Sequence, residues 1–344
     1  MPKQLPSISA RKEDHIRINL DQDVRSGIST GLERYSFPHQ ALPELNLEKM
    51  DLSLALFGKN ISAPIFISSM TGGTEAARLI NQNLALAAQE TGIPMGLGSQ
   101  RAALEKPELA ETYQVRKYAP DIILFANLGA VQLNYGLTPE DCQKAVDLVK
   151  ADGLILHLNS LQEAVMTDGN TDFSGLAEKI SEVCQTIEVP IIIKEVGWGI
   201  SQKAAQLLDQ AGVSAIDVAG AGGTSWTEVE MHRADNDNAR KTASAFINWG
   251  IPTAESIQIV KNALPEMLIF ASGGLRNGLD IAKAIALGAR IGGMAGPFLK
   301  AASESADAVI TEINRIKREI QISMFGAGVG NLKSLSEIQL TQNK

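Results

Sequence analysis

The stretch PIIIKEV at residues 190–196 is an apolar run that begins at a proline and turns polar only near its end. Similar short runs recur along the chain at residues 64–70, 94–99, 121–129, 153–159, 190–196, 214–220, 268–274 and 290–296. Nearly continuous apolar runs are typical of strands that are covered on both faces, as in a parallel sheet. Eight such runs, separated by amphipathic stretches, predict an α/β protein with a (β/α)8 TIM barrel. A doubly wound open sheet is the alternative, but it usually has about five or six strands.

Helix signals lie between these runs. We expect helices over residues 75–91, 139–150, 174–186, 201–211, 254–263 and 278–287. Gly92, Gly212 and Gly288 each follow such a stretch, where a left-handed residue ends a helix. Thr138 offers an N-cap in front of Pro139, a favoured first helical residue. The punctuation therefore supports the alternating pattern.

The barrel accounts for most of the chain. Residues 1–60 precede the first run and are predicted to form an N-terminal extension, and residues 61–344 to form the barrel with a C-terminal helix. The longest interval separates the sixth and seventh runs, so we expect residues 225–249 to form a long active-site loop. Gly326 to Gly330 follow a helical stretch rather than a strand, so they predict a C-terminal turn and not a nucleotide loop.

The composition of the chain excludes several classes of function. The 344 residues include 31 Lys+Arg and 39 Asp+Glu, a net charge of −8, which argues against nucleic acid or an anionic membrane as a partner. The chain is 44% hydrophobic and 20% charged, which excludes wholesale disorder. Its two cysteines form neither a disulfide framework nor a zinc cage. With no long apolar segment, we expect a soluble protein of a reducing compartment.

Polar side chains gather late in the apolar runs. In a barrel of this kind the carboxyl ends of the strands carry the active site. The residues at these run ends are Ser68, Ser69, the apolar Met70, Thr71, Ser99, Gln100, Arg101, Asn127, His157, Asn159, Lys194 and Asp217. Their repeated occurrence at the same end predicts one site.

Two charged residues have alternative interpretations. Lys194 follows three isoleucines, and a buried ammonium needs an anionic or carbonyl-rich partner, either a ligand or a carboxylate such as Asp217. Glu163 suits Mg²⁺ held by one carboxylate, waters and substrate phosphates. The other interpretation of Glu163 is an acid in the first turn of a helix.

Glycine pairs and a few cations suggest a phosphate site. Gly273-Gly274 and the segment at 292–296 end the seventh and eighth runs, where this fold often binds phosphate. Arg11, Lys12 and Arg101 supply positive charge in an otherwise acidic protein. The chain contains no GxxxxGK[ST], HExxH or GxSxG motif, which argues against the commonest nucleotide-binding, metalloprotease and hydrolase classes.

Several motifs, in order along nearly the whole chain, resemble those of the type 2, flavin-dependent isopentenyl-diphosphate delta-isomerases. They are Arg11-Lys12 with His15, Met70-Thr71-Gly72-Gly73, Gly98-Ser99-Gln100, the FANLG at 125–129, the HLN at 157–159 followed by Gln162-Glu163, the KEVG at 194–197, Gly222-Gly223-Thr224, the ASGG at 271–274 and Met294-Ala295-Gly296. The HLNxxQE and KEVG segments are the specific ones, because glycine pairs occur in many flavin barrels.

The resemblance implies a barrel that binds FMN and Mg²⁺, with NADPH as reductant, and that interconverts isopentenyl and dimethylallyl diphosphate. By that likeness, the cofactor would contact Ser69, Met70, Thr71, Ser99, Asn127, Lys194, Thr224, Gly273, Gly274, Leu275, Arg276, Ala295 and Gly296. The diphosphate would contact Arg11, Lys12, Ser99, Gln100, Arg101, Asn159 and Gln162, and Glu163 would bind the metal. His157, Gln162 and Lys194 would be catalytic. The family also implies a cytoplasmic homotetramer or homo-octamer.

Other classes fit less well. An FMN-dependent α-hydroxy-acid oxidase or dehydrogenase needs a basic histidine between strands six and seven, but residues 219–226 contain none. An IMP-dehydrogenase-like enzyme needs a loop cysteine, whereas Cys142 and Cys184 fall in predicted helices. A non-catalytic flavin- or phosphate-binding module would leave the polar strand ends without a chemical task.

Overall fold

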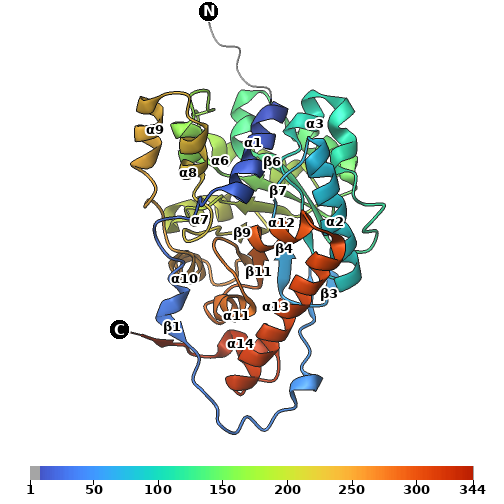
Figure 1. Ribbon diagram of the computed structural model, residues 1–344, viewed down its shortest axis with the longest axis vertical. Coiled ribbons are helices and arrows are strands. Elements are labelled where there is room, and N and C mark those ends of the chain that lie inside the picture. Colours follow the sequence, from blue (N-terminus) through green and yellow to red (C-terminus); the bar gives the residue numbers. More distant parts are fainter. Residues whose placement is uncertain (1–7, 344) are drawn as a thin grey trace, which may run out of the picture.

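The centre of the protein is a closed barrel of eight parallel strands in the computed structural model, which describes residues 8–343 (Figure 1). The strands are β4 (Ile65–Ile67), β5 (Met95–Gly96), β6 (Leu124–Gly129), β7 (Gly153–His157), β8 (Ile191–Lys194), β9 (Ala215–Asp217), β10 (Ile269–Ala271) and β11 (Ile291–Met294). They pair in chain order, and β11 pairs with β4 to close the barrel. Each predicted run contains one strand, so the predicted (β/α)8 barrel is confirmed.

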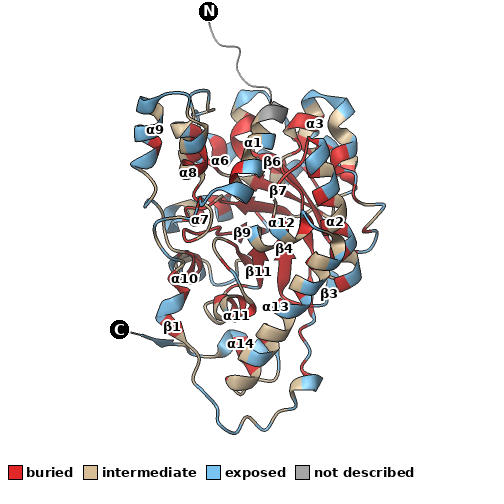
Figure 2. Ribbon diagram, viewed as in Figure 1, coloured by how far each residue is buried: buried red, intermediate tan, exposed pale blue. Residues whose placement is uncertain are grey.

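Helices surround the barrel and follow the predicted alternation. The larger ones are α2 (Glu75–Thr91), α4 (Pro139–Val149), α6 (Leu176–Thr186), α7 (Gln202–Gln210), α10 (Thr253–Ala263), α11 (Gly278–Ala286) and α13 (Ala306–Gly326). Shorter turns are α3 (Arg101–Glu105), η3 (Pro107–Tyr113), η4 (Ala130–Tyr135), α5 (Ser160–Val165) and α12 (Gly296–Ala302). Figure 2 shows buried strands inside helices whose outer faces are exposed.

The helix caps and helix-ending glycines lie where the sequence predicts them. Thr138 and Asp141 form a reciprocal capping box at the start of α4. Gly92, Gly212 and Gly288 have φ angles of 68°, 85° and 121°, the region that a side chain disfavours. Gly328, with φ 71°, lies just beyond α13, which confirms the predicted C-terminal turn.

The amino end of the barrel is filled by apolar side chains. Phe66, Phe125 and Phe270 are fully buried, with ring centroids 5.6–6.5 Å apart. The hairpin of β2 (Leu54–Leu56) and β3 (Lys59–Ile61) places Phe57 against this cluster, 6.2 Å from the rings of Phe125 and Phe270. The turn at Phe57-Gly58 has φ angles of 44° and 78°, which suits a two-residue hairpin. The opposite, carboxyl end of the barrel is therefore the end that is open to a ligand.

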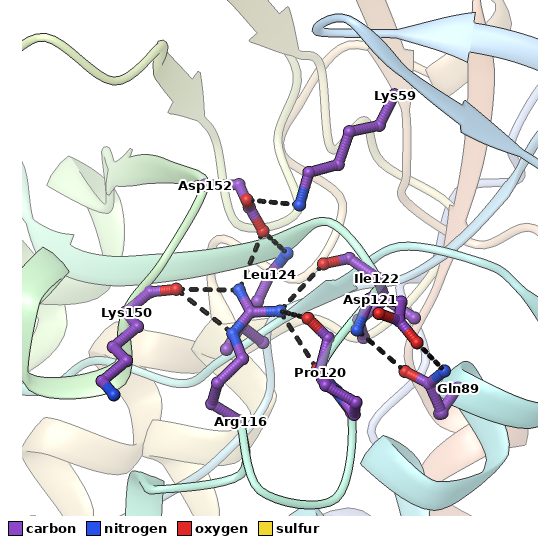
Figure 3. A network of polar contacts seen from close by, with 10 residues as sticks. Lys59, Gln89, Arg116, Pro120, Asp121, Ile122, Leu124, Lys150 and Asp152 are labelled. Atoms are coloured by element: carbon purple, nitrogen blue, oxygen red, sulfur yellow. Dashed lines mark hydrogen bonds and ion pairs between the residues drawn. The ribbon is translucent and has the colours of Figure 1, made fainter.

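A polar network fixes this hairpin to the barrel (Figure 3). Asp152, just before β7, accepts from Lys59 Nζ at 2.6 Å, from Arg116 Nη2 at 2.8 Å and from the Leu124 N–H at 2.9 Å. The Arg116 guanidinium also donates to the carbonyls of Ala119, Pro120, Ile122 and Lys150. One arginine thus binds the segment before β6 to the start of β7 and, through Asp152, to β3.

The connection after β9 corrects one expectation. The length of residues 225–249 predicts a long loop, but they contain α8 (Trp226–Arg233) and α9 (Asp237–Ser244). Ser225 and Asn236 cap these helices, each side chain accepting from a backbone N–H of the first turn. Residues 234–236 form the short link between the two helices.

The N-terminal extension packs against both ends of the barrel. α1 (Ile8–Asp21) lies beside α8 at the carboxyl end (Figure 1), and Ser26 N and Ser225 N donate to Gly223 O and Val24 O, both at 2.7 Å. The remaining elements are η1 (Leu32–Arg34), β1 (Tyr35–Ser36), η2 (Leu47–Lys49), α14 (Leu332–Glu337) and β12 (Thr341–Gln342). β1 pairs antiparallel with β12. Within residues 8–343, no helix is long and apolar enough to cross a membrane.

Candidate active site

A cavity of about 1060 Å³ opens at the carboxyl end of the barrel, under α1 and α8. Its size exceeds the range of about 300–1,000 Å³ that is typical of a single small-ligand pocket. The predicted site residues that line it are Arg11, Lys12, Ser69, Met70, Thr71, Ser99, Arg101, Asn127, His157, Asn159, Gln162, Glu163, Lys194, Thr224, Gly273, Gly274, Leu275, Arg276, Ala295 and Gly296. The fold therefore brings together residues from α1 and from the loops of all eight strands.

Gln100 is the exception among the predicted residues. Its side chain is fully buried and donates from Nε2 to Ala145 O at 2.8 Å, while its Oε1 accepts from Asn127 N at 3.0 Å. Both ends of the amide are thus bound to β6 and α4, and the structure does not bring the side chain to the cavity. Gln100 braces Asn127 instead of facing a ligand.

His157 and Asn127 form a pair on neighbouring strands. His157 Nδ1 lies 2.9 Å from Asn127 Oδ1. Burial lowers the pKa of His157 to about 4, and the nearby charges of Lys194 and Lys12 act in the same direction. The imidazole is therefore neutral at physiological pH. It can accept a hydrogen bond at one nitrogen and donate at the other.

Lys194 is buried at the end of β8, and its ammonium donates to Glu195 O at 2.7 Å. The expected alternative, an ion pair with Asp217, is not formed in the described part of the chain. Asp217 instead accepts from the backbone N–H and the hydroxyl of Ser272 at 3.0 and 2.8 Å. Burial raises the pKa of Asp217, and the charge of Lys194 opposes that rise.

Glu195 shapes the loop behind Lys194. Its Oε2 accepts from the N–H groups of Val196, Gly197 and Trp198, at 2.7, 2.7 and 2.5 Å. Burial raises the pKa of Glu195 to about 7 despite these bonds. The loop geometry therefore depends on a carboxylate that faces away from solvent, and that loop holds the Lys194 acceptor.

A series of hydrogen-bonded polar side chains connects α5 with α8 and α1 at the side of the cavity. Asn159 Nδ2 donates to Glu163 Oε1 at 2.8 Å and to Gln162 Oε1 at 3.2 Å. Gln162 Nε2 donates to Glu230 Oε1 at 2.9 Å, which also lies 3.2 Å from His15 Nε2. Burial raises the pKa of Glu230, but the hydrogen bonds from His15 and Gln162 and the charges of His15 and Arg233 together lower the pKa by more, so it lies below its usual value.

The cations come from α1 and α3. Lys12 Nζ donates to Ser99 O at 2.6 Å and to the Tyr113 hydroxyl at 2.5 Å. Burial lowers the pKa of Lys12 to about 7, and the charge of Arg11 contributes. Arg101 pairs with Glu105 at 2.7 Å on α3 and is only partly exposed. An anionic ligand would stabilise the protonated form of Lys12.

Two features fit a flavin phosphate and ring. Gly223 and Gly274 approach so closely that a Cβ on Gly223 would lie 2.6 Å from Gly274 N, whereas a Cβ on Gly296 would meet nothing within 4 Å. Backbone N–H groups at such positions can approach a phosphate. The Ser69 hydroxyl is buried in the cavity wall without a hydrogen-bond partner. An orphaned buried hydroxyl is explained by a polar ligand.

The metal prediction fits a site completed by substrate. Within residues 8–343, no three His, Cys, Asp or Glu side chains gather to hold an ion. Glu163 accepts from Asn159 Nδ2 at 2.8 Å and from Asn170 N at 2.6 Å, and Asn159 Oδ1 is buried and unpartnered. Mg²⁺ commonly binds through one or two carboxylates, waters and substrate phosphates. One carboxylate and one amide oxygen are therefore compatible with it.

Sequence patterns missed several residues of this site. Trp226 and Glu230 lie on α8, in a segment that showed no strand-end signal. Met166, Asn19 and Trp226 also line the cavity. For Trp226 and Glu230, the hint in the sequence is the Gly222-Gly223-Thr224 motif directly before α8. A helix in that connection, with one face toward the barrel mouth, could have been sought on that ground.

The chain resembles known proteins over nearly its full length. The model of the FMN-dependent dehydrogenase family matches residues 134–342. The isopentenyl-diphosphate delta-isomerase of Synechocystis sp. is 54% identical over 337 residues, 98% of this chain and 97% of that protein. The protein of the same name from Rickettsia bellii (strain RML369-C) is 51% identical over 333 residues, 97% of each chain.

Solved structures support the fold alone. A lactate oxidase of Pediococcus acidilactici superposes with a TM-score of 0.68 at 16% identity, covering 97% of this chain and 93% of that one. A mandelate oxidase variant with an FMN adduct superposes with a TM-score of 0.66 at 16% identity, covering 97% and 100%. Both are similar to this chain in architecture. At such low sequence identity, the similarity gives no information about the substrate.

Proposed function

The chain belongs to the isopentenyl-diphosphate delta-isomerase family, and we propose that its cavity holds FMN beside the diphosphate substrate. The reaction moves a carbon–carbon double bond between isopentenyl and dimethylallyl diphosphate. One carbon gains a proton and another loses one, so the reaction has no net redox change. The single observation that carries the proposal is the convergence of the flavin-type loops, the cations and Glu163 on one cavity.

The cofactor side of the cavity is the ring of strand loops. FMN would be held by Ser69, Met70, Thr71, Ser99, Asn127, Lys194, Thr224, Gly273, Gly274, Leu275, Arg276, Ala295 and Gly296. Reduced FMN, when bound, would supply a proton donor and acceptor strong enough for an alkene. The ammonium of Lys194 would stabilise negative charge on the cofactor. NADPH would be the reductant that brings the flavin to its active state.

The substrate side lies under α1. Arg11, Lys12 and Arg101 would bind the diphosphate, together with Asn159 and Gln162. Glu163 would bind Mg²⁺, whose other ligands would be diphosphate oxygens and water. Neutral His157 and Gln162 would orient the substrate and hold or pass protons. Gln100, whose side chain is turned away, would act only through Asn127.

The N-terminal extension belongs to this function. In the structure α1 brings Arg11 and Lys12 to the cavity of its own chain. We take residues 1–60 as an extension that supplies these cations to a barrel at 61–344. A cytoplasmic homotetramer or homo-octamer is part of the same proposal, and the resemblance to the family supports it.

One experiment tests the proposal. The purified protein is incubated anaerobically with FMN, Mg²⁺, NADPH and isopentenyl diphosphate, and dimethylallyl diphosphate is measured against samples that lack one component. We expect FMN to give a yellow flavoprotein whose colour fades when NADPH reduces it, and product only in the complete mixture, with Glu163→Gln requiring more Mg²⁺. Absence of product, together with oxidation of lactate or glycolate, would replace the proposal with the α-hydroxy-acid oxidase alternative.

A further inference from the structure

A buried tyrosine connects the predicted diphosphate-binding lysine to the strand loops. Tyr113 ends η3 and is fully buried. Its hydroxyl lies 2.7 Å from Ser99 O and 2.5 Å from Lys12 Nζ, and Lys12 Nζ is 2.6 Å from the same carbonyl. The three polar atoms thus form a closed triangle between η3, α1 and the loop after β5.

The direction of each hydrogen bond follows from the groups. Burial raises the pKa of Tyr113, so the phenol keeps its proton, and a carbonyl such as Ser99 O can only accept it. The hydroxyl oxygen therefore accepts from Lys12. A protonated lysine has three hydrogens, of which the carbonyl and the phenol take two. The third is left for an acceptor in the cavity that Lys12 lines.

The tyrosine ring is itself held in place. A Cβ on Gly72 would lie 2.0 Å from Tyr113 Cε1, so the ring occupies the space that a side chain there would need. The neighbouring Thr112 accepts from Gly73 N at 2.9 Å through its hydroxyl. Tyr113 is thus packed in a fixed position between the loop after β4 and the loop after β5.

We propose that Tyr113 is a positioning residue for diphosphate binding, acting through Lys12. The inference rests on the proposed function, because it assumes that Lys12 meets a diphosphate. A lysine side chain loses rotamer entropy when it is fixed. The Tyr113 hydroxyl and Ser99 O fix it before the ligand arrives, and preorganisation of this kind increases affinity.

The test is a double-mutant cycle of Tyr113→Phe and Lys12→Met in the FMN-loaded protein. Inorganic pyrophosphate is the binding probe, and isopentenyl diphosphate turnover gives KM and kcat. For Tyr113→Phe we expect the pyrophosphate Kd and the KM to rise about tenfold, the size of one lost hydrogen bond to a charged group, with kcat nearly unchanged. In the Lys12→Met background, Tyr113→Phe should change neither constant.

Tyr35→Phe is the matched control, since it removes another buried tyrosine hydroxyl, bonded to Gln258 at 2.9 Å and outside the cavity. It should leave both constants unchanged. The ring of Tyr113→Phe still fills the space beside Gly72, and FMN affinity and melting temperature report whether the fold is kept. Equal effects of Tyr113→Phe in both backgrounds, a fall in kcat alone, or no change in Kd would overturn the inference. A wild-type protein that binds pyrophosphate but makes no product would instead contradict the proposed function.

Discussion

His157 Nδ1 lies 2.9 Å from Asn127 Oδ1, across the pairing of β7 with β6. An amide oxygen only accepts, so the contact assigns the proton of the neutral ring to Nδ1 and leaves Nε2 as an acceptor. Asn127 is held in turn, since its N–H donates to Gln100 Oε1 at 3.0 Å. Gln100, which lies outside the cavity, therefore holds the backbone of the residue whose side chain selects the tautomer of His157.

The pKa of His157 predicts an acid-labile fold. In the unfolded chain the histidine has its ordinary pKa of 6.5, and burial lowers the pKa to about 4 in the folded protein. Between these values the unfolded state binds more protons, so stability falls as pH decreases from 6.5 toward 4. We expect this residue to cost about 2 kcal/mol of unfolding free energy by pH 5 relative to pH 8. Denaturant titrations of wild type and His157→Gln at both pH values measure it, and an equal pH dependence would contradict it.

Lys12 predicts a pH-dependent substrate affinity. Its pKa of about 7 in the free protein is lowered by burial and by Arg11, and Tyr113, His157 and Ser99 O also face it. Above pH 7 the lysine is increasingly neutral, so the KM for the diphosphate should rise up to about tenfold per pH unit. Lys12→Arg keeps its charge and should remove this rise. Both proteins share the substrate's own ionisation, so parallel KM profiles from pH 6 to 9 would count against the prediction.

How much the sequence predicts follows from where each signal lies. PIIIKEV predicts β8 because its apolar residues are buried on both faces, and Lys194 stands out as the charge at its end. Polar residues of other strand ends reach the cavity for the same reason. Gln100 follows a strand too, but its side chain turns toward Ala145 O. Its direction depends on a partner 45 residues away, which no local pattern encodes.

Tyr113 and Glu230 illustrate the other limit. Each lies on a helical turn between strands, and its role comes from contacts with α1: Lys12 for Tyr113 and His15 for Glu230. The packing of α1 over the barrel mouth is a long-range event with no periodic signal in the sequence. The pattern of strands therefore predicts the cavity floor, whereas the residues that connect its cover to the barrel become visible only in three dimensions.

From the hydrogen bonds of Arg116 we predict that removing its side chain strongly lowers the stability of the fold but leaves catalysis intact. Arg116 donates to four carbonyls and to Asp152, and its side chain is 18% exposed. Its removal leaves those acceptors and the carboxylate short of donors. We expect Arg116→Ala to lower the free energy of unfolding by about 3 kcal/mol. Arg240→Ala, which breaks an exposed pair with Asp237, is the control and should change it by less than about 0.5 kcal/mol. Equal denaturation midpoints for the two variants would show that the network adds little.

Two glycines predict opposite outcomes. A Cβ on Gly98 would lie 2.5 Å from the Thr71 carbonyl carbon, so Gly98→Ala should displace the loop after β4 and lower the melting temperature of the apoprotein. A Cβ on Gly296 would meet no protein atom within 4 Å, so Gly296→Ala should leave that temperature unchanged. Since Gly296 lines the predicted phosphate site, Gly296→Ala should nevertheless weaken FMN binding. Thermal melts and FMN titrations separate the two effects, and unchanged FMN affinity in Gly296→Ala would place the phosphate elsewhere.

From the position of Lys194 we predict that its ammonium contacts the cofactor. Its buried ammonium donates to Glu195 O and lines the cavity, and no carboxylate among the described residues pairs with it. A charge buried in this way is stabilised when an anionic ligand binds. We expect Lys194→Met to weaken FMN binding at least about tenfold and to abolish most isomerase activity. Lys203→Met, at an exposed position on α7, is the control for removal of a lysine and should change neither. Full activity and wild-type FMN affinity in Lys194→Met would show that this lysine is a structural residue of β8 and not part of the site.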